Sequence, residues 1–334
     1  MTVTEPLVSV IIPTYNRPSF LKAAIAGALA QTYTNIEVFV SDDCSPESPE
    51  DLIRSFGDPR IRFQRNPKNL GMYLNTVNTF KAARGKYVAS LNDDDVWQPD
   101  FLAKLIPALE ADSTLALAFC DQYIIDQAGE VDEAATAHFS RRWKRLRLKQ
   151  GVYRPFYREG LVDLAVATAS AAVLRKDAID WAEHSPNAGV FWDLYTTFLA
   201  CRNGAGAYYC PEKLTCYRIH PQSENVVSGH RDVQAKLRKG EAGRFCYGQF
   251  MAEPAFKTYQ GFFKREWAHA TTTLGIAHLR SGDRVQARAY LWESWRHQPL
   301  NLRTAIALTL SLMPSSLGSA AAALRNPNLF SKAR

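Results

Sequence analysis

The first 125 residues alternate between continuous apolar runs and segments with helical periodicity. The apolar runs are short and rich in β-branched residues, which is typical of strands buried on both faces of a sheet. They cover residues 7–12, 36–40, 61–64, 87–91 and 115–123. Helical spacing of apolar positions predicts helices at residues 19–31, 49–56, 72–83 and 101–110, the first of them capped by Ser19. This alternation predicts an α/β fold with a Rossmann-like, mostly parallel sheet.

Polar loops follow three of these strands, at residues 14–17, 42–45 and 92–95. The carboxyl ends of parallel strands meet at one edge of a doubly wound sheet, and ligands bind beyond that edge. We therefore expect the three loops to line one site. Two of them are acidic, since Asp42 and Asp43 lie in the second loop and three aspartates lie in the third.

The third loop, Asn92-Asp93-Asp94-Asp95, is the most acidic stretch of the chain. Three consecutive carboxylates repel one another unless a cation offsets their charge. Mg²⁺ and Mn²⁺ prefer oxygen ligands and commonly share them with substrate phosphates. The stretch therefore predicts a metal-diphosphate site, and a solvated acidic turn before the helix at residues 101–110 is the alternative.

Composition narrows the class of protein. A hydrophobic content of 46% and a charged content of 22% are ordinary for a globular protein and exclude wholesale disorder. The six cysteines show no C-x-x-C spacing and the first residues lack a signal-peptide pattern, which together predict reduced thiols in the cytoplasm. No apolar run approaches the roughly 20 residues that cross a bilayer. The net charge of +7 permits attraction to anionic ligands, lipids or nucleic acid without choosing among them.

Three segments occur in the order and spacing of family 2 glycosyltransferases. They are Val-Ser-Val-Ile-Ile-Pro-Thr-Tyr-Asn-Arg at residues 8–17, Ser-Asp-Asp-Cys-Ser at 41–45 and Leu-Asn-Asp-Asp-Asp-Val-Trp-Gln-Pro-Asp at 91–100. The chain resembles this family over about residues 7–225. The resemblance implies a GT-A nucleotide-diphospho-sugar transferase fold. It also implies an inverting glycosyltransferase that moves a hexosyl or related group from a nucleoside-diphosphate sugar, typically a UDP-sugar, to a glycan or lipid-linked acceptor in cell-surface polysaccharide synthesis.

The same resemblance implies roles for individual residues. Asp43 would accept a hydrogen bond from the base, and the segment from Asn69 resembles an Asn-x-Gly segment of the family. The implied nucleotide-binding residues are Pro13, Thr14, Tyr15, Asn16, Asp43, Asn69, Asp93 and Asp94. The implied ligands of a divalent metal, Mn²⁺ or Mg²⁺, are Asp94, Asp95 and His220, and Arg218 would neutralise diphosphate charge.

Two positions depart from the family pattern. Many relatives carry an acidic residue where this chain has Asn92, and an amide offers an acceptor oxygen without charge. The family usually has an arginine soon after its Asn-x-Gly segment to help hold the nucleotide, and none follows promptly here. The residues that can take its place are Arg65, Lys68, Tyr73 and Asn75.

Residues 189–195 resemble the segment in which the family places its catalytic carboxylate before a helix, which makes Asp193 the candidate base. Inverting transfer requires a group that removes the proton of the acceptor hydroxyl, and a carboxylate can do this. A position favoured by the helix dipole is the alternative, and both roles can coexist. Residues 216–223 resemble the family's Tyr-Arg-x-His-Pro-x-Ser segment, in which Arg218 and His220 can also serve only to order the loop.

The second half of the chain carries a different pattern. Residues 141–149 form its most basic run, which predicts a solvated helix face or a contact with an anionic acceptor or an anionic membrane. No nucleic-acid motif accompanies it, so nucleic acid is not an expected partner. Residues 168–174 predict another strand, and helices are expected beyond residue 229, including 262–280, 284–295 and 302–312.

These patterns predict two domains. The catalytic domain is expected at residues 1–228, with a nucleotide-binding half at about 1–125 and an acceptor-binding half at 126–228. A helical C-terminal region at 229–334 would pack on the catalytic domain or lie on a membrane, with Trp292, Trp295, Arg296 and Arg303 near the headgroups. The expected protein is cytoplasmic and peripheral on the inner face of the cell membrane.

Two other functions remain open. A nucleotidyltransferase also joins such a sheet to a metal and a nucleotide, but it would normally show a glycine-rich loop after the first strand, and residues 13–17 contain no glycine. A nucleotide-sugar-binding scaffold protein without turnover would keep the fold, and Asn92 is the residue that favours it.

Overall fold

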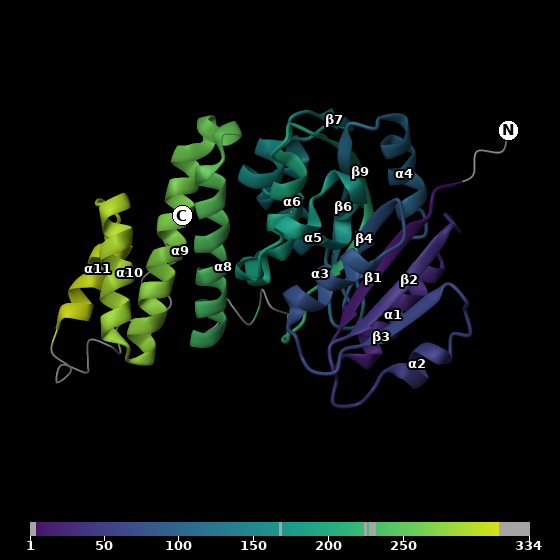
Figure 1. Ribbon diagram of the computed structural model, residues 1–334, viewed down its shortest axis with the longest axis horizontal. Coiled ribbons are helices and arrows are strands. Elements are labelled where there is room, and N and C mark those ends of the chain that lie inside the picture. Colours follow the sequence, from purple (N-terminus) through teal and green to yellow (C-terminus); the bar gives the residue numbers. More distant parts are fainter. Residues whose placement is uncertain (1–4, 167–168, 224–225, 227–231, 314–334) are drawn as a thin grey trace. The chain divides into compact units, whose positions relative to one another are not determined.

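The computed structural model describes residues 5–166, 169–223, 226 and 232–313. The chain divides into two compact units (Figure 1). The first contains Met1–Pro186 and Trp192–His220, and the second contains Asn187–Phe191 and Pro221–Arg334. The first unit thus holds most of the predicted catalytic domain, whose boundary at residue 228 stays a prediction.

A nine-stranded sheet forms the centre of the first unit, in the order β3-β2-β1-β4-β8-β6-β9-β5 with β7 beside β9. The strands are β1 (Val8–Thr14), β2 (Ile36–Asp42), β3 (Ile61–Arg65), β4 (Tyr87–Ser90), β5 (Val96–Trp97), β6 (Leu115–Ile125), β7 (Gly151–Tyr153), β8 (Ala172–Arg175) and β9 (Gly206–Arg218). β1 pairs in parallel with β2 and β4, β2 with β3, and β6 with β9, whereas β8 is antiparallel to both of its neighbours. The α/β architecture with a mostly parallel N-terminal half agrees with the sequence pattern.

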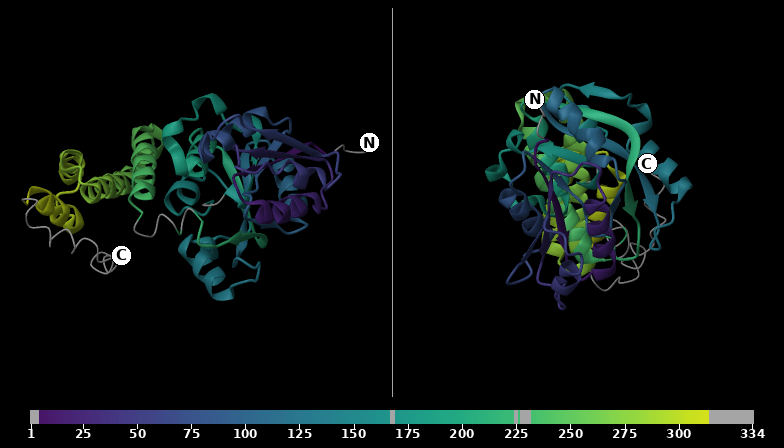
Figure 2. Two further views of the ribbon diagram at one scale, coloured as in Figure 1. Left: turned by 90° about the horizontal axis from the view of Figure 1, so that it is seen from below. Right: turned by 90° about the vertical axis from the view of Figure 1, so that its right-hand side faces the viewer.

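Helices cover both faces of this sheet (Figures 1 and 2). They are α1 (Pro18–Leu29), α2 (Glu50–Arg54), α3 (Met72–Ala82), α4 (Phe101–Ala111), α5 (Glu133–Arg142) and α6 (Trp192–Cys201). The side chains of Val8, Val10 and Ile12 join those of α1 and α4 in one buried core. β1 is buried on both faces, which explains its uninterrupted apolar sequence.

Two local predictions are wrong. Ser19 does not cap α1, because the helix begins one residue earlier at Pro18, whose fixed φ suits the first turn. The strand predicted at residues 168–174 is shorter, since a 3₁₀ turn at Ala169–Ala171 precedes β8 and residue 168 lies outside the described residues. This turn carries Ser170, which contacts the candidate site.

The second unit is helical where it is described, with α8 (Val233–Ala252), α9 (Gln260–Ser281), α10 (Arg284–His297) and α11 (Leu302–Leu312). α9 and α10 approach closely at Gly275, where a Cβ would lie 2.6 Å from Leu291 Cγ. The left-handed φ of +90° at Gly282 ends α9, and Asp283 caps α10 by accepting a hydrogen bond from Gln286 N. The helices predicted at 262–280, 284–295 and 302–312 are therefore confirmed.

Two further features bear on the class of protein. None of the six cysteines, all of which lie in the described part of the chain, forms a disulfide bond. Among the described residues, no helix combines the length and the apolar character that crossing a bilayer requires. Trp292 on α10, which was expected near lipid headgroups, is 46% exposed, and its contact with a membrane stays a prediction.

Candidate active site

The three polar loops meet at the carboxyl edge of the sheet because β1 lies between β2 and β4. The backbone N–H of Asp43 donates to Thr14 O at 2.9 Å, and Asn16 N donates to Ser45 Oγ at 2.8 Å. The Thr14 hydroxyl donates to Asp93 Oδ2 at 2.8 Å. Thr14 and Asn16 therefore join the first loop to both acidic loops.

Arg17 bridges two carboxylates of the third loop. One of its guanidinium nitrogens, Nη1, lies 3.1 Å from Asp93 Oδ1 and 3.0 Å from Asp94 Oδ2. Asp93 is 5% exposed, and its burial together with the charge of Asp94 raises the pKa of Asp93 to about 6. A positive group therefore lies where the sequence analysis expected one.

Arg17 is the functional residue that the sequence analysis missed. It directly follows the Pro-Thr-Tyr-Asn loop, and its role depends on β4 being the neighbour of β1 in the sheet. An oppositely charged residue at the end of an adjacent parallel strand is the signal that could have found it.

Asp95 fastens the acidic loop to the rest of the unit. Its Oδ2 accepts hydrogen bonds from Ser170 Oγ at 2.7 Å and from Asn92 Nδ2 at 3.1 Å, and its Oδ1 accepts one from Arg218 N at 2.9 Å. Burial, followed by the charge of Asp94, raises the pKa of Asp95 to about 8. The amide at Asn92 thus donates to a carboxylate that an acidic residue at position 92 would repel.

Asp94 and His220 are the two candidate metal ligands that lie side by side in the site. His220 Nε2 lies 3.1 Å from Asp94 Oδ2, and the imidazole is 4% exposed beside the Phe20 ring, 4.8 Å between centroids. Within the described part of the chain, no group of three or more His, Cys, Asp and Glu residues is arranged to hold a metal ion. A carboxylate and an imidazole still suit a divalent ion that takes its other ligands from a diphosphate and water.

Arg218 orders two loops of the site. Its Nε donates to Asp94 O at 2.8 Å, and its Nη1 donates to Asp126 O at 2.9 Å and to Gln127 O at 3.3 Å. The guanidinium also lies over the Phe20 ring, 5.1 Å from its centroid. Backbone carbonyl groups thus hold the guanidinium of Arg218, to which the resemblance gives the role of neutralising diphosphate charge.

Asp43 shapes the loop that was expected to hold the base. Its Oδ1 accepts hydrogen bonds from Asn66 Nδ2 at 2.9 Å and Leu70 N at 2.8 Å, and its Oδ2 accepts one from Gly71 N at 2.8 Å. Gly71 has a φ of +83°, a conformation that favours glycine. Asn69 accepts a hydrogen bond from Gly71 N at 3.0 Å, so Asn69 and Asp43 belong to one loop structure.

The four substitutes for the missing arginine differ in their surroundings. Asn75 is 3% exposed and bonds to Ser41 and Asn66, and Tyr73 is 7% exposed. Arg65 donates to Ser45 O at 2.6 Å and lies 3.5 Å from Asp42 Oδ2, and Lys68 is exposed. Tyr15 is 46% exposed at the rim of the first loop. Arg65 is therefore the cation nearest the second loop.

Asp193 lies in the first turn of α6, apart from this network. Its Oδ1 accepts a hydrogen bond from Leu194 N at 2.8 Å. Among the described residues it has no ion-pair partner, and burial raises its pKa to about 6. A carboxylate with this pKa is largely ionised at neutral pH and can accept a proton.

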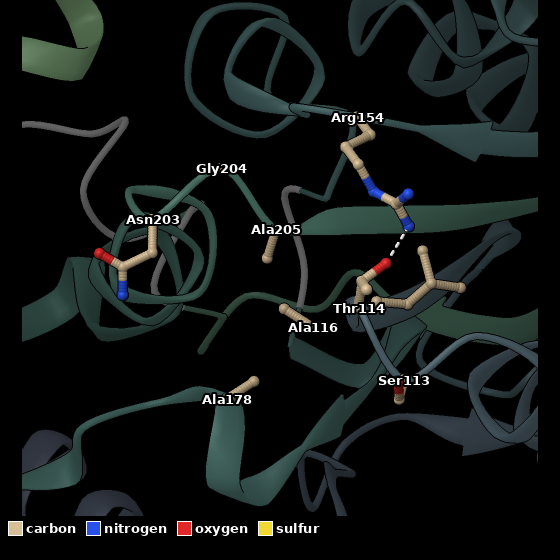
Figure 3. Close-up of a pocket in the computed structure, with 9 residues that line it drawn as sticks. Ser113, Thr114, Ala116, Arg154, Ala178, Asn203, Gly204 and Ala205 are labelled. Atoms are coloured by element: carbon tan, nitrogen blue, oxygen red, sulfur yellow. Dashed lines mark hydrogen bonds between the residues drawn. The ribbon is translucent and has the colours of Figure 1, made fainter.

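A separate pocket of about 480 Å³ lies at the opposite edge of the sheet (Figure 3). Its lining includes the start of β6 and the residues before β6 and β9, and Arg154 there donates to Thr114 and Asp112. None of the candidate site residues lines it. The candidate site is therefore the loop-lined carboxyl edge.

Residues 9–180 match the model of the family described as glycosyl transferase family 2. The chain belongs to glycosyl transferase family 2. The resemblance seen in the sequence is thereby confirmed. The match includes all three strand-end loops and ends before α6, so it covers Asp94 and leaves out Asp193 and His220.

The matches to curated relatives cover only part of each relative's length. An uncharacterized glycosyltransferase of Rickettsia prowazekii is 37% identical over 124 residues, which are 37% of this chain and 38% of the relative. The putative colanic acid biosynthesis glycosyl transferase WcaA of Escherichia coli is 32% identical over 38% of this chain and 46% of its own. The putative teichuronic acid biosynthesis glycosyltransferase TuaG of Bacillus subtilis is 30% identical over 39% of this chain and 52% of its own. The chain thus spans about half or less of these relatives.

Two solved structures share the fold of this family 2 chain. Staphylococcus aureus TarS, crystallised with UDP-GlcNAc, has a TM-score of 0.61 and 14% identity and covers 90% of this chain and 83% of its own. The mannosyltransferase PcManGT of Pyrobaculum calidifontis, in complex with GDP-Man and Mn²⁺, has a TM-score of 0.54 and 18% identity over 99% and 89%. The predicted α/β GT-A fold is confirmed.

Proposed function

We propose that this chain is an inverting glycosyltransferase that moves a sugar from a nucleoside diphosphate, expected to be UDP, to a glycan or lipid-linked acceptor. The observation that carries the proposal is the convergence of three strand-end loops on the pair formed by Asp94 and His220, 3.1 Å apart. Membership of family 2 and the sugar-nucleotide complexes of TarS and PcManGT support it.

The donor would bind across the loops that follow β1, β2 and β4. The loop from Pro13 to Asn16 would border the nucleotide, and Asp43 with Asn69 would hold the loop that faces the base, since both bond to Gly71 N. Asp93 is fixed by Thr14 and Arg17 beside this region. The structural support for this set is its internal bonding, which preorganises a surface lined by polar groups.

Asp94 and His220 would hold a divalent metal, Mn²⁺ or Mg²⁺, and Asp95 would position Asp94 through its bonds to Ser170 and Arg218. When bound, the metal supplies positive charge that stabilises the departing diphosphate. Arg17 lies 3.0 Å from Asp94 Oδ2 and would add a second positive charge there, while Arg218 would act mainly on the loop. The Mn²⁺ in the PcManGT complex supports this cofactor.

Asp193 would act as the base. It would accept the proton of the acceptor hydroxyl as that oxygen attacks the anomeric carbon and the bond to the diphosphate breaks. Its position in the first turn of α6 places positive backbone dipoles beside the ionised form. Its raised pKa of about 6 leaves it able to take up this proton near neutral pH.

The support for the proposed acceptor and for the proposed cellular location comes from the relatives rather than from the site. WcaA and TuaG are named for the biosynthesis of colanic and teichuronic acid, which supports a role in cell-surface polysaccharide synthesis. A position on the inner face of the cell membrane is part of the proposal, because lipid-linked acceptors lie there.

A thermal-shift screen of UDP-, GDP- and dTDP-sugars with Mn²⁺ tests the donor, because a ligand that binds only the folded state raises its apparent stability. We expect one nucleotide class to raise the Tm, and to raise it further when metal is present. Turnover is then followed as release of the nucleoside diphosphate. Binding without release on any acceptor would support the scaffold alternative instead.

A further inference from the structure

The basic run of the sequence forms a surface that the proposed chemistry does not use. It consists of the end of α5 and the turn after it, and we call it the basic patch: Arg141, Arg142, Lys144, Arg147 and Lys149. Four of these five residues are exposed and Lys144 is half-buried. Among the described residues none of the five has a carboxylate partner, whereas Arg54, Lys86 and Lys104 elsewhere in this unit each form an ion pair.

The run is not one helix face, because its central residue points inward. Arg145 is 1% exposed, its Nε donates to Ala165 O at 2.7 Å, and its Nη1 donates to Gln122 Oε1 at 3.0 Å. The same nitrogen lies 3.4 Å from Asp121 Oδ1. α5 ends at Arg142, and the left-handed φ of +58° at Lys144 turns the chain. The prediction of a solvated helix face is therefore wrong for Arg145.

This internal arginine gives the patch a fixed support. Losing one partner of a buried, hydrogen-bonded charge pair is costly, so Asp121, Gln122 and Ala165 hold Arg145 in place. The next residue, Leu146, is 63% exposed and is flanked in the sequence by the unpaired cations Lys144 and Arg147, besides the buried Arg145. An exposed leucine held among unpaired cations gains most from a partner that is both anionic and apolar.

The helix that carries part of the patch packs against a strand that reaches the candidate site. Phe139 of α5 contacts the Tyr217 ring at 5.6 Å between centroids, and the next residue, Arg218, donates its backbone N–H to Asp95. Thr136 of α5 accepts a hydrogen bond from Ile124 N on β6 at 2.9 Å. In Figure 2, left, α5 projects from the sheet of its own unit, and Arg141 and Arg142 at its end are exposed.

We propose that the basic patch, together with Leu146, is a docking surface for an anionic phospholipid bilayer. The five cations match lipid phosphates and carboxylates in charge, and Leu146 would enter the boundary between headgroups and acyl chains. A soluble anionic polymer would use the cations but would have no use for Leu146. This inference deepens the proposed function, because it would hold the acceptor side of the site at the surface where a lipid-linked acceptor lies.

Vesicle flotation with the full chain tests the surface without requiring turnover. The vesicles contain phosphatidylcholine alone or phosphatidylcholine mixed with the anionic lipid phosphatidylglycerol. The test variant R141Q/R147Q/K149Q keeps Arg142, which stacks over Trp143 at 5.2 Å, and so spares the packing of the turn. The matched control K22Q/R54Q/R84Q removes the same charge from exposed residues outside the patch.

We expect the test variant to bind anionic vesicles about 100-fold more weakly than the wild type, at roughly fivefold per cation. The control variant should lose less than about fivefold. Residues 232–334 carry 15 Lys and Arg against 6 Asp and Glu, and vesicle binding through those charges would persist in both variants. Equal losses in the two variants, or no binding by the wild type, would overturn the proposal.

Leu146→Ser separates a bilayer from a soluble polyanion. We expect about tenfold weaker binding to anionic vesicles, with inorganic polyphosphate binding unchanged. An unchanged vesicle affinity in Leu146→Ser, with polyphosphate displacing the wild type from vesicles, would replace the bilayer by a polyanionic partner. The variants must keep the wild-type Tm. Since no sugar donor is present, failure of glycosyl transfer would leave this result unaffected.

Discussion

The carboxylates of the acidic loop and the carboxylate of Asp193 lie in the same unit but have very different hydrogen-bond and ion-pair partners. Asp93, Asp94 and Asp95 lie in a network that includes Arg17, Ser170 and the backbone N–H of Arg218. Asp193 bonds only to a backbone N–H of its own helix and has no cation beside it among the described residues. The carboxylates of the acidic loop can therefore exchange one positive group for another, whereas Asp193 has no such group to exchange and is left to bind a proton.

The difference follows from position in the fold. The acidic loop follows β4, a central strand, so the ends of β1 and β9 supply it with partners. Asp193 lies in the first turn of a helix, where backbone N–H groups are the nearest donors. We therefore propose the loop for cation binding and Asp193 for proton transfer, and the following variants test this contrast.

The largest effect is expected for Asp193→Asn. Loss of a general base typically lowers kcat by 10²- to 10⁴-fold, and we expect about 10³-fold here because the amide cannot accept the proton. Donor affinity should stay within about twofold in a thermal-shift titration. In the wild type kcat should rise as the pH passes about 6 and the carboxylate ionises, and this rise should vanish in the variant. A variant with full kcat would return Asp193 to a purely structural role.

Asp94→Asn should act on the metal instead. Removing the charged ligand of the Asp94–His220 pair should weaken Mn²⁺-dependent donor binding by about 100-fold and leave metal-independent binding unchanged. Asp43→Asn is the matched control, since it also removes one carboxylate from a strand-end loop. It should lower donor affinity with and without metal alike, as measured by calorimetry. The same metal response in both variants would contradict the assignment of Asp94.

Arg17→Met tests whether the acidic loop shares its charge. Without the guanidinium, the repulsion that Arg17 exerts on a second cation disappears, and we expect Mn²⁺ alone to bind about tenfold more tightly in a paramagnetic resonance titration. Binding of a nucleoside diphosphate should weaken by about tenfold, because a cation beside Asp94 is lost. Both affinities of Arg17→Lys should lie between those of the wild type and those of Arg17→Met. Weaker Mn²⁺ binding in Arg17→Met would mean that Arg17 only positions the carboxylates.

Much of this arrangement could be predicted from the sequence. Apolar runs such as β1 and β2 identified the buried strands, and the doubly wound rule then brought the loops after β1, β2 and β4 to one edge. The three aspartates of the acidic loop predicted a positive group beside them, but the sequence did not identify Arg17 as that group. Arg17 was not assigned, because its pairing depends on β1 and β4 being neighbours in the folded sheet.

The basic run shows the opposite case. Its composition suggested a uniform charged surface, yet Arg145 is buried because Asp121 and Gln122 on β6 lie beneath it. Sequence cannot separate one buried arginine from exposed neighbours when its partners lie more than 20 residues away. The carbonyl partners of Arg218 were hidden for the same reason, since the sequence shows charges but not which backbone groups approach them.

The smallest effect is on stability. Burial raises the pKa of Asp193 to about 6, so ionising this carboxylate disfavours the folded state. Its stabilising contribution is complete below the unfolded pKa of roughly 3.9 and is lost as the pH rises through about 6. Asp193→Asn should therefore gain about 1 kcal/mol in the free energy of unfolding, relative to the wild type, between about pH 5 and pH 8.

Urea unfolding of both proteins at the two pH values measures this difference. Burial also lowers the pKa of His184 to about 4, but both proteins contain this histidine and its contribution cancels in the comparison. The acidic loop is likewise unchanged. A difference that stays constant with pH would mean that Asp193 ionises as freely in the folded chain as in the unfolded one. The contrast between a carboxylate that takes a proton and carboxylates that share a cation would then lose its basis.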